Sequence, residues 1–484
     1  MNVKSISKNV GMALLVSSFF MLLGVVVSLI DGKDSAFGAL LISCIITFLT
    51  GIFPFIFVKG TQPISLKDGF VIIVLSWLLS FIFGMLPYIM WGGEMSLADA
   101  WFESVSGFTT TGATVLNNVE ALPRSLLFWR SSTHFIGGLG VVVFLLLIIP
   151  GSSPMKMRLA NMELTNLTKS GYAVRANRTV YMFAWVYLAL CVFSLVAYLL
   201  AGMSFFDAIC HAMSVSATGG FSTRNASIAA FDSRWVEGIT MIFMYLSSIH
   251  FGIIYITFVT RSLKPLDNPV LKFHTLCIVL FSLLCAFCFK MEGICEGWIS
   301  SLWNGLFATL CVSSTSGFAL LDNAVWPIWL MTALMFAAVM CGSAGSTSGG
   351  VKVDRIILFF KTVVRRIRNI LHPSSMNEIW LGKRILRNED VAPHLFYLAL
   401  YGFIIFVSIF LALITGVDTQ NSFIASVTSL GNVGPAYGAL GTMGSFNSVP
   451  LLGKMLFTID MFLGRVEIYP VLAVMAMIFD KKRV

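Results

Sequence analysis

The chain has 484 residues, of which 57% are hydrophobic and only 11% are charged, and its net charge is +9 at pH 7. Ordinary soluble domains carry about 25% charged residues, so this composition excludes a soluble globular protein. The basic residues lie in loops between apolar runs and form no separate basic domain, so we expect no nucleic-acid partner.

Apolar runs that could cross a bilayer recur along the whole chain, since about 20 apolar residues suffice for a helical span. The first run follows Lys4 and Lys8 and lacks a small-residue cleavage site, which favours a retained helix over a signal peptide. The ten candidate spans are 9–30, 36–58, 69–91, 126–149, 181–203, 237–260, 273–289, 327–341, 394–415 and 453–478. The sequence therefore predicts an all-α, multi-pass integral membrane protein.

The distribution of basic residues predicts the orientation of these spans. If the N-terminus lies inside the cell, 24 of the 32 Lys and Arg residues fall in loops on the same side. Because short cytoplasmic loops are rich in Lys and Arg, we expect both termini to be cytoplasmic.

Four segments between alternate spans are too short and too polar to cross the membrane. They cover residues 99–114, 207–222, 304–319 and 421–436. Aligned on one glycine each, they contain four short motifs, which we call the filter segments. These are Thr110, Thr111 and Gly112; Thr218, Gly219 and Gly220; Thr315, Ser316 and Gly317; and Asn432, Val433 and Gly434. The aligned glycines are 108, 97 and 117 residues apart, which indicates an internal repeat.

The repeat divides the chain into five parts. Residues 1–60 form two extra N-terminal transmembrane helices, and the pore repeats cover 61–180, 181–265, 266–390 and 391–484. Thirteen residues before each aligned glycine stands an Asp or Asn, the residue types that cap helix N-termini. These are Asp99, Asp207, Asn304 and Asn421. We therefore predict four capped half-length pore helices, so that each unit reads helix, pore loop, helix around one pore.

Such units suit a cation. Non-helical backbone at membrane depth must line water or be buried in protein. Four half-helices that enter from outside would aim their negative carboxyl ends at the membrane centre. Ordered carbonyls from the four loops could then replace the hydration shell of a cation. The alternative, four ordinary Ser/Thr/Gly loops, does not account for the shared register.

At these residues the sequence resembles the Trk/Ktr/HKT superfamily of cation transporters, and most closely its TrkH-type potassium uptake subunits. The resemblance covers nearly the whole chain and includes Gly137–Gly140, the glycine-rich stretch 342–350 and the run Leu463–Glu467. It implies four pseudo-symmetric units around one pore, with the two extra N-terminal helices of the TrkH branch. It also implies a bacterial inner-membrane location, a homodimer, and a cytoplasmic ring of nucleotide-binding TrkA-type regulatory subunits.

The resemblance also bears on the ion. Glycine at all four filter positions is associated with potassium, whereas serine at the first is associated with sodium in plant relatives. We therefore expect K⁺ as the only metal, held at the filter segments, and no bound cofactor. Sodium or another monovalent cation is the alternative. Asn432, Val433 and the following Pro435 depart from the other filters, so strict four-fold symmetry is not expected.

The second span of the third repeat is interrupted by residues rich in Gly, Ser and Thr, which we call the gate loop (342–350). Four glycines here, each costing a helix about 1 kcal/mol relative to alanine, argue against a continuous helix. A flexible plug beneath the filter is the functional interpretation, and a plain cytoplasmic loop is the alternative. The predicted gate residues are Gly342, Gly345, Ser346, Thr347, Gly349, Gly350, Lys352 and Arg465.

Arg465 lies inside the last predicted span, where a charge is costly and marks a functional site by default. We predict that it faces the pore beside the gate loop as an electrostatic barrier, and a salt bridge between helices is the alternative. Glu467, two residues away, is not an obvious local partner. His211 could tune the second pore helix with pH. Cys285 and Cys288 form a CxxC pair that we interpret as buried apolar side chains.

Two other classes of function are less favoured. No cluster of acids, histidines or a nucleophile motif supports a membrane enzyme. A secondary transporter of organic solutes would use broken helices but would not call for four half-helices around one axis. The sequence leaves open whether transport is passive or coupled to protons or sodium. It also leaves open how Ser247-Ser248 and the similar Ser131–Phe135 align between repeats.

Overall fold

The computed structural model describes residues 2–60, 64–93, 95–140, 176–372, 378–381, 384–386 and 388–479. Its helices are α1 (Val3–Ile30), α2 (Phe37–Phe57), α3 (Leu66–Gly84), α4 (Leu86–Trp91), α5 (Leu97–Phe108), α6 (Arg124–Leu139), α9 (Ala176–Leu200), α10 (Phe205–Ser216), α11 (Arg234–Ser248), α12 (Phe251–Thr260), α13 (Pro269–Met291), α14 (Trp298–Ser313), α15 (Ile328–Met340), α16 (Val353–Leu371), α17 (Asn388–Ile414), α18 (Thr419–Leu430), α19 (Leu451–Arg465) and α20 (Tyr469–Phe479). Within the described ranges the strands are β1 (Ile379–Leu381) and β2 (Arg384–Leu386), an antiparallel pair. The predicted all-α class is confirmed.

Six of the predicted spans are long apolar helices, counted over the described residues. They are α1, α2, α3 with α4, α9, α13 and α17. Their outward faces carry large exposed apolar side chains, such as Phe193, Leu280 and Phe406, each more than half exposed. Apolar surface on this scale is typical of a face in contact with lipid.

The four predicted spans that follow the re-entrant segments behave differently. The spans predicted at 237–260 and 453–478 are each divided by a sharp bend, which was not predicted: α11 and α12 meet at 101°, and α19 and α20 meet at 108°. The span predicted at 327–341 is the 13-residue helix α15. The span predicted at 126–149 begins as α6, and its residues 141–149 lie outside the described part of the chain.

These four helices end after 13 to 16 residues. α11 ends in the extended residue Ile249, whereas the backbone turns left-handed at or just beyond the ends of the other three. Gly140 follows α6 with φ 76°, and Cys341 follows α15 with φ 43°. Beyond α19, Glu467 and Ile468 have φ of 57° and 25°. A side-chained residue avoids positive φ unless the surrounding structure imposes it, so packing against neighbours decides these breaks.

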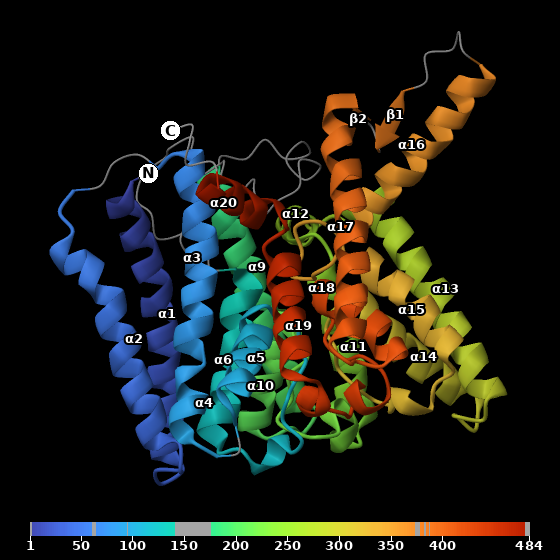
Figure 1. Cartoon of the computed structure of the whole chain (residues 1–484). Helices are drawn as coiled ribbons and strands as arrows, with labels where there is room; N and C mark the ends of the chain where they lie inside the picture. The colour runs from blue at the N-terminus through green and yellow to red at the C-terminus, as the bar shows by residue number, and fades with distance from the viewer. Residues whose placement is uncertain are drawn as a thin grey trace.

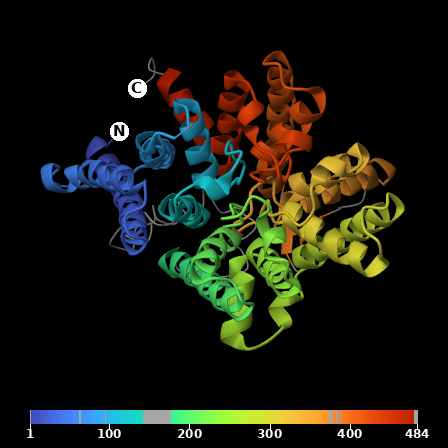
Figure 2. The ribbon, with the colours of Figure 1, turned by 90° about the horizontal axis from the view of Figure 1, so that it is seen from below.

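The units surround a common centre in chain order. Seen from below, the cyan, green, yellow and red segments follow one another around the middle, and the first two helices lie outside them (Figure 2). α1 and α2 pack closely where two glycines meet. A Cβ added to Gly11 would lie only 2.6 Å from the Gly51 carbonyl oxygen, so glycine allows this approach. The boundaries of the five predicted parts stay a prediction.

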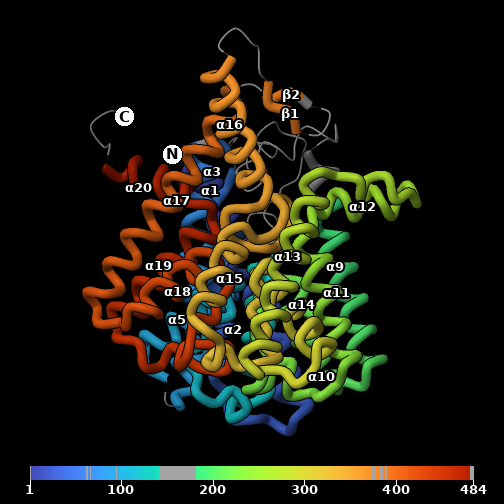
Figure 3. Tube along the Cα trace, turned by 90° about the vertical axis from the view of Figure 1, so that its right-hand side faces the viewer, coloured from blue at the N-terminus to red at the C-terminus, as the bar shows by residue number. Residues whose placement is uncertain are grey.

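The start of α1 and the end of α20 lie at the same end of the bundle (Figure 1). We call this the terminal end. Beyond its bend, α12 projects sideways near this end, and α16 rises past it toward β1 and β2 (Figure 3). The breaks in the helices and the predicted gate loop therefore lie toward the terminal end.

Candidate ion-conducting site

Each filter segment follows a short helix, namely α5, α10, α14 or α18. The prediction that Asp99, Asp207 and Asn421 cap three of these helices is wrong by one turn. The caps are Ser96, Ser204 and Asp418, whose side chains accept hydrogen bonds from the backbone N–H three residues later. The predicted residues supply those N–H donors, and the Asp99 carboxylate also accepts a hydrogen bond from the Ser96 N–H. A capping-box pattern of Ser or Asp three residues upstream would have identified the true caps.

The prediction that Asn304 is a cap is also wrong. α14 begins at Trp298, so Asn304 lies inside the helix, where its Nδ2 donates to the Ser300 carbonyl at 3.0 Å. The N-cap of α14 is Gly297, which has no side chain to accept a hydrogen bond. The third pore helix therefore begins earlier than the other three and without their polar cap.

The carboxyl ends of the four helices have the same geometry. The N–H at the second filter position bonds the carbonyl five residues back, at 2.9, 2.9, 2.9 and 2.8 Å in the four segments. The first filter residue is left-handed in each, and these residues are Thr110 (φ 52°), Thr218 (54°), Thr315 (60°) and Asn432 (54°). This is the Schellman pattern that ends helices, usually with glycine. Threonine in this conformation is a strained exception of the kind found at functional sites.

The filter glycines pack the four segments side by side in a closed ring. A Cβ added to Gly112 would overlap the Gly219 carbonyl, and one on Gly220 would overlap the Ser316 carbonyl. One on Gly317 would meet the Val433 carbonyl, and one on Gly434 would overlap the Thr111 carbonyl. All four glycines also have positive φ, from 70° to 96°. Glycine is therefore required four times, both by its backbone angle and by the carbonyl of the next segment.

This ring can favour a cation. The first residue of each filter segment is almost fully buried, with Thr110 and Thr315 each 1% exposed and Thr218 and Asn432 fully buried. Four helices end at it, and each helix carboxyl end carries about −0.5 of partial charge. The outer side of the ring opens into a hollow lined by Gly112, Gly220 and Gly317 together with polar loop residues. A cation could therefore reach the ring from this hollow and lose its hydration shell there.

A buried ion pair braces the outer side of the first two filter segments, and sequence reasoning missed it. Arg130 of α6 lies 2.7 Å from the carboxylate of Glu103 on α5, and their side chains are 2% and 0% exposed. Arg130 also donates to the Ser222 carbonyl at 3.2 Å, and Glu103 accepts from the Val115 N–H at 3.2 Å. A charged pair inside two predicted membrane segments is a signal that could have indicated it.

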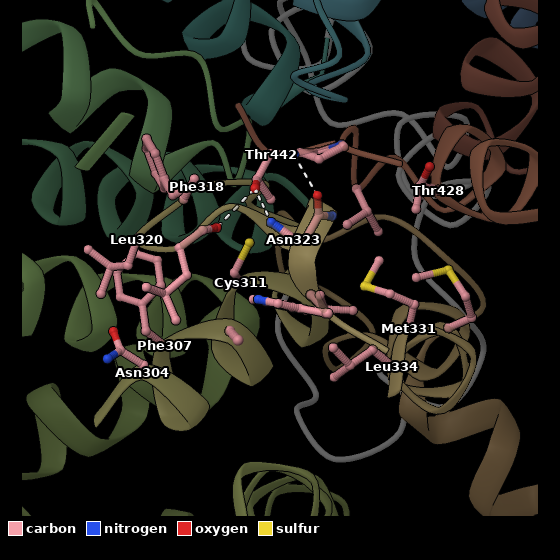
Figure 4. A pocket seen from close by; sticks show the side chains of 18 residues that line it. Asn304, Phe307, Cys311, Phe318, Leu320, Asn323, Met331, Leu334, Thr428 and Thr442 are labelled. Atoms are coloured by element: carbon pink, nitrogen blue, oxygen red, sulfur yellow. Dashed lines mark hydrogen bonds between the residues drawn. The ribbon is translucent and has the colours of Figure 1, made fainter. Parts of the chain in front are cut away.

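Behind the third and fourth filter segments lies a mostly apolar cavity (Figure 4). Its lining includes Cys311, Phe318 and Val433, so the Val433 side chain packs away from the ring while its carbonyl faces Gly317. Asn323 and Thr442 close one side through two hydrogen bonds of 3.2 and 3.1 Å. The loop after the third segment is therefore tied to the loop after the fourth.

The gate loop is buried, so the alternative of a plain cytoplasmic loop is wrong. Ser343, Thr347 and Ser348 are 3–4% exposed. Thr347 donates from Oγ1 to the Ser216 carbonyl, at the end of α10, at 3.1 Å. The Gly349 N–H donates to Thr315 Oγ1 at 2.9 Å. The loop thus lies against the inner side of the filter ring, on the side of the helix carboxyl ends.

The break between α11 and α12 receives this loop. The Ser248 carbonyl accepts from the Ser343 N–H at 2.9 Å, and the Phe251 N–H donates to the Gly345 carbonyl at 3.0 Å. A Cβ on Gly345 would lie 2.9 Å from the ring of His250. Ser247-Ser248 therefore serves as a docking edge for the gate loop. The sequence had left open how these two residues align between repeats.

Arg465 lies beside the gate loop, as predicted. It is the last residue of α19 and donates to the Thr347 carbonyl at 2.9 Å and to the Gly137 carbonyl, near the end of α6, at 2.7 Å. It thus ties the gate loop to two of the interrupted helices. Its predicted role as a barrier to ions stays a prediction.

The predicted gate residue Lys352 and the unpredicted Arg355 anchor the far end of the loop. Lys352 is 8% exposed and donates through Nζ to the Ser348 carbonyl. Next to it, Arg355 forms a 3.0 Å ion pair with Glu467 and stacks 3.9 Å over the Tyr397 ring. Glu467 thus has a partner from α16. This pairing links the break after α19 to the start of α16, and it was not expected from the sequence.

The remaining candidates have local roles. His211 contacts the Asp207 carbonyl at 2.8 Å and Ser222 Oγ at 2.9 Å. Cys285 and Cys288 are buried free thiols. Within the described residues, no three His, Cys, Asp or Glu side chains lie close enough together to hold a metal ion. A tuning role of His211 stays a prediction.

Residues 39–483 match the family model TrkH, a cation transport protein. The chain is 31% identical over 486 residues to the Trk system potassium uptake protein TrkH of Halomonas elongata, covering 100% of both chains. It is 31% identical to the TrkH protein of Salmonella typhimurium over 98% of both. It superimposes on the crystal structure of the potassium transporter TrkH from Vibrio parahaemolyticus with a TM-score of 0.87 and 30% identity, over 98% of both chains.

Proposed function

The chain belongs to the TrkH family of cation transport proteins, and we propose that it is the potassium-conducting subunit of a Trk-type uptake system. The observation that carries this proposal is the closed ring of filter glycines, each packed on the carbonyl of the next segment. A ring of backbone carbonyls replaces the hydration shell of a cation. The relatives named as potassium uptake proteins support potassium as that cation.

K⁺ would pass from the outer hollow through the filter segments to the gate loop. In the conformation described, that loop contacts the inner side of the ring, and Arg465 adds a positive charge beside it. Conduction therefore requires the loop to move. Removing the loop should raise the ion flux.

Assembly and location complete the proposal. The subunit is a homodimer in a bacterial inner membrane, surrounded by lipid, with both termini cytoplasmic and a TrkA-type nucleotide-binding ring on the terminal end. The name of the relatives, Trk system, supports a multi-component system. The basic loops on one side support the orientation. The chain acts in transport rather than catalysis and needs no bound cofactor besides the K⁺ in its pore.

Flux of K⁺, Rb⁺ and Na⁺ into liposomes that contain the purified chain tests this function. We expect K⁺ and Rb⁺ uptake well above that of Na⁺. Equal Na⁺ uptake would make the chain a general monovalent cation transporter, and the absence of alkali-ion flux would contradict the proposal. Adding a TrkA-type ring with nucleotide should change the K⁺ flux if the ring is the partner.

A further inference from the structure

Asn432 occupies the filter position at which the other three segments have threonine. Its side chain Nδ2 donates to Thr111 Oγ1 at 3.0 Å and to the Met461 carbonyl at 2.9 Å. A backbone carbonyl can only accept a hydrogen bond, so the atom facing Met461 must be the nitrogen. The orientation of the amide is thereby determined, and Oδ1 points to the other side.

That oxygen has no hydrogen-bond partner among the described residues, and it is buried. Its neighbours are two glycines: a Cβ built on Gly349 would lie 3.1 Å from it, and one built on Gly464 would lie 2.9 Å from it. Leaving a buried acceptor unpaired costs about 1–3 kcal/mol. An oxygen kept here without a donor therefore needs a partner that arrives in another state of the protein.

A second side-chain oxygen lies against the same gate-loop residue. Thr315 Oγ1 accepts from the Gly349 N–H at 2.9 Å. Gly349 thus donates a hydrogen bond to an oxygen of the third filter segment, Thr315 Oγ1, and lies over an oxygen of the fourth, Asn432 Oδ1. If the gate loop leaves, both oxygens lose their neighbour together, at the inner end of the ring.

We propose that Asn432 Oδ1 and Thr315 Oγ1 form an inner cation site that the gate loop covers in the closed state. The inference rests on the proposed function and deepens it. The Gly349 N–H and an incoming K⁺ compete for Thr315 Oγ1, and Gly349 covers Asn432 Oδ1, so the loop and the ion exclude each other. The site is asymmetric, because it belongs to the third and fourth segments alone.

The corresponding threonine of the second segment provides a matched control. Thr218 has the same left-handed backbone as Thr315, with φ 54° against 60°. Its hydroxyl donates to the neighbouring Ala217 carbonyl at 2.7 Å and not to the gate loop. Valine has nearly the shape of threonine, so Thr218→Val and Thr315→Val both remove one hydroxyl and little else.

Block by Ba²⁺, a divalent ion close to K⁺ in size, measures the site directly. Single-channel currents are recorded in planar bilayers, with Ba²⁺ added on the side of the gate loop. All variants carry Gly349→Ala, which disturbs loop seating. We expect Thr315→Val to weaken the block about tenfold, which corresponds to 1.4 kcal/mol, and Thr218→Val to change it less than about threefold. Asn432→Leu, which keeps the size but removes both Oδ1 and the Nδ2 donor, should weaken it at least as much as Thr315→Val does.

Each outcome decides the proposal. Equal block in Thr315→Val and Thr218→Val would overturn it, because the inner site would then not depend on this pair. Wild-type block in Asn432→Leu would likewise overturn it. Asn432 would then only hold Thr111 and Met461 together and would not bind the ion. If Asn432→Leu does not fold, the comparison of the two valine variants still decides. A chain that conducts no alkali ion at all fails the proposed function instead, which separates the two failures.

Discussion

The filter ring and the gate beneath it are built on opposite principles. The ring repeats one local pattern four times: a short helix, a left-handed residue and a glycine packed on the next carbonyl. The gate uses parts that differ in every unit, with a loop from the third, a docking edge from the second and Arg465 from the fourth. Repetition suits a site that surrounds an ion on an axis, whereas one loop suffices to close it.

The largest expected effect breaks the ring itself. Gly220→Ala should reduce K⁺ flux at least tenfold, because its Cβ would overlap the Ser316 carbonyl and its φ is 85°. Gly202→Ala is the matched control, since its φ is 92° and a Cβ there meets nothing within 4 Å. Uptake of K⁺ or Rb⁺ by liposomes measures both. Similar losses in the two variants would mean that backbone strain, and not the ring contact, is responsible.

The next effect disturbs the gate loop where it packs against the fourth filter segment. In Gly349→Ala the new Cβ would overlap the Gly431 carbonyl, so the gate loop cannot seat as it does here. Destabilising the closed state by about 1.4 kcal/mol shifts the balance between open and closed forms tenfold, and resting flux should rise accordingly. Gly202→Ala, whose new Cβ would meet nothing within 4 Å, is the control. Flux that stays at the resting level in Gly349→Ala would argue against the loop as the gate.

Substitutions of Arg465 can separate the effect of its positive charge from that of its hydrogen bonds to the Thr347 and Gly137 carbonyls. Arg465→Ala should raise conductance, because it removes the charge and both bonds to the Thr347 and Gly137 carbonyls. Lysine keeps the charge but not the planar fork of donors. If Arg465→Lys conducts like the wild type, the charge forms the barrier. If it conducts like Arg465→Ala, the tether matters, and unchanged conductance in both would contradict either role.

The smallest effect concerns the helices that lead to the ring. Ser96→Ala removes the N-cap of α5 and should cost about 1 kcal/mol of stability. Gly297→Ser should add the cap that α14 lacks and stabilise by a few tenths of a kcal/mol. Thermal unfolding in detergent measures both. A loss of stability in Gly297→Ser would mean that the start of α14 is held by packing and not by capping.

Much of the ring could be predicted because its determinants are local. The Asp and Asn residues in register did mark the helix starts, although Asp99, Asp207 and Asn421 lie three residues past the true caps. The prediction of Asn304 as a cap was wrong because α14 begins one turn earlier than the other pore helices and has no polar cap to show where it begins. The filter glycines were found because their backbone angle and close packing leave no other choice.

The gate could be predicted only in outline. The glycines of 342–350 indicated an interruption, and the charge of Arg465 indicated a special site in the membrane. The bends after α11 and α19 were not predicted, because Ser247-Ser248 and Val466–Ile468 do not forbid a helix by propensity. They break because the gate loop and Arg355 take up backbone and side-chain partners that a straight helix would not present.

The sequence by itself determined that the chain lies in a membrane, that its fold is all-α, and where the four filter segments and the glycine-rich interruption at 342–350 fall. Apolar length, helix ends and glycine are local properties, and each can be read along one stretch of chain. Only the tertiary structure decided which carbonyl each glycine meets, where Arg465 donates and which oxygen of Asn432 lacks a partner. These depend on contacts between residues far apart in the sequence, from 29 positions for Asn432 and Met461 to 328 for Arg465 and Gly137, and no local pattern encodes them.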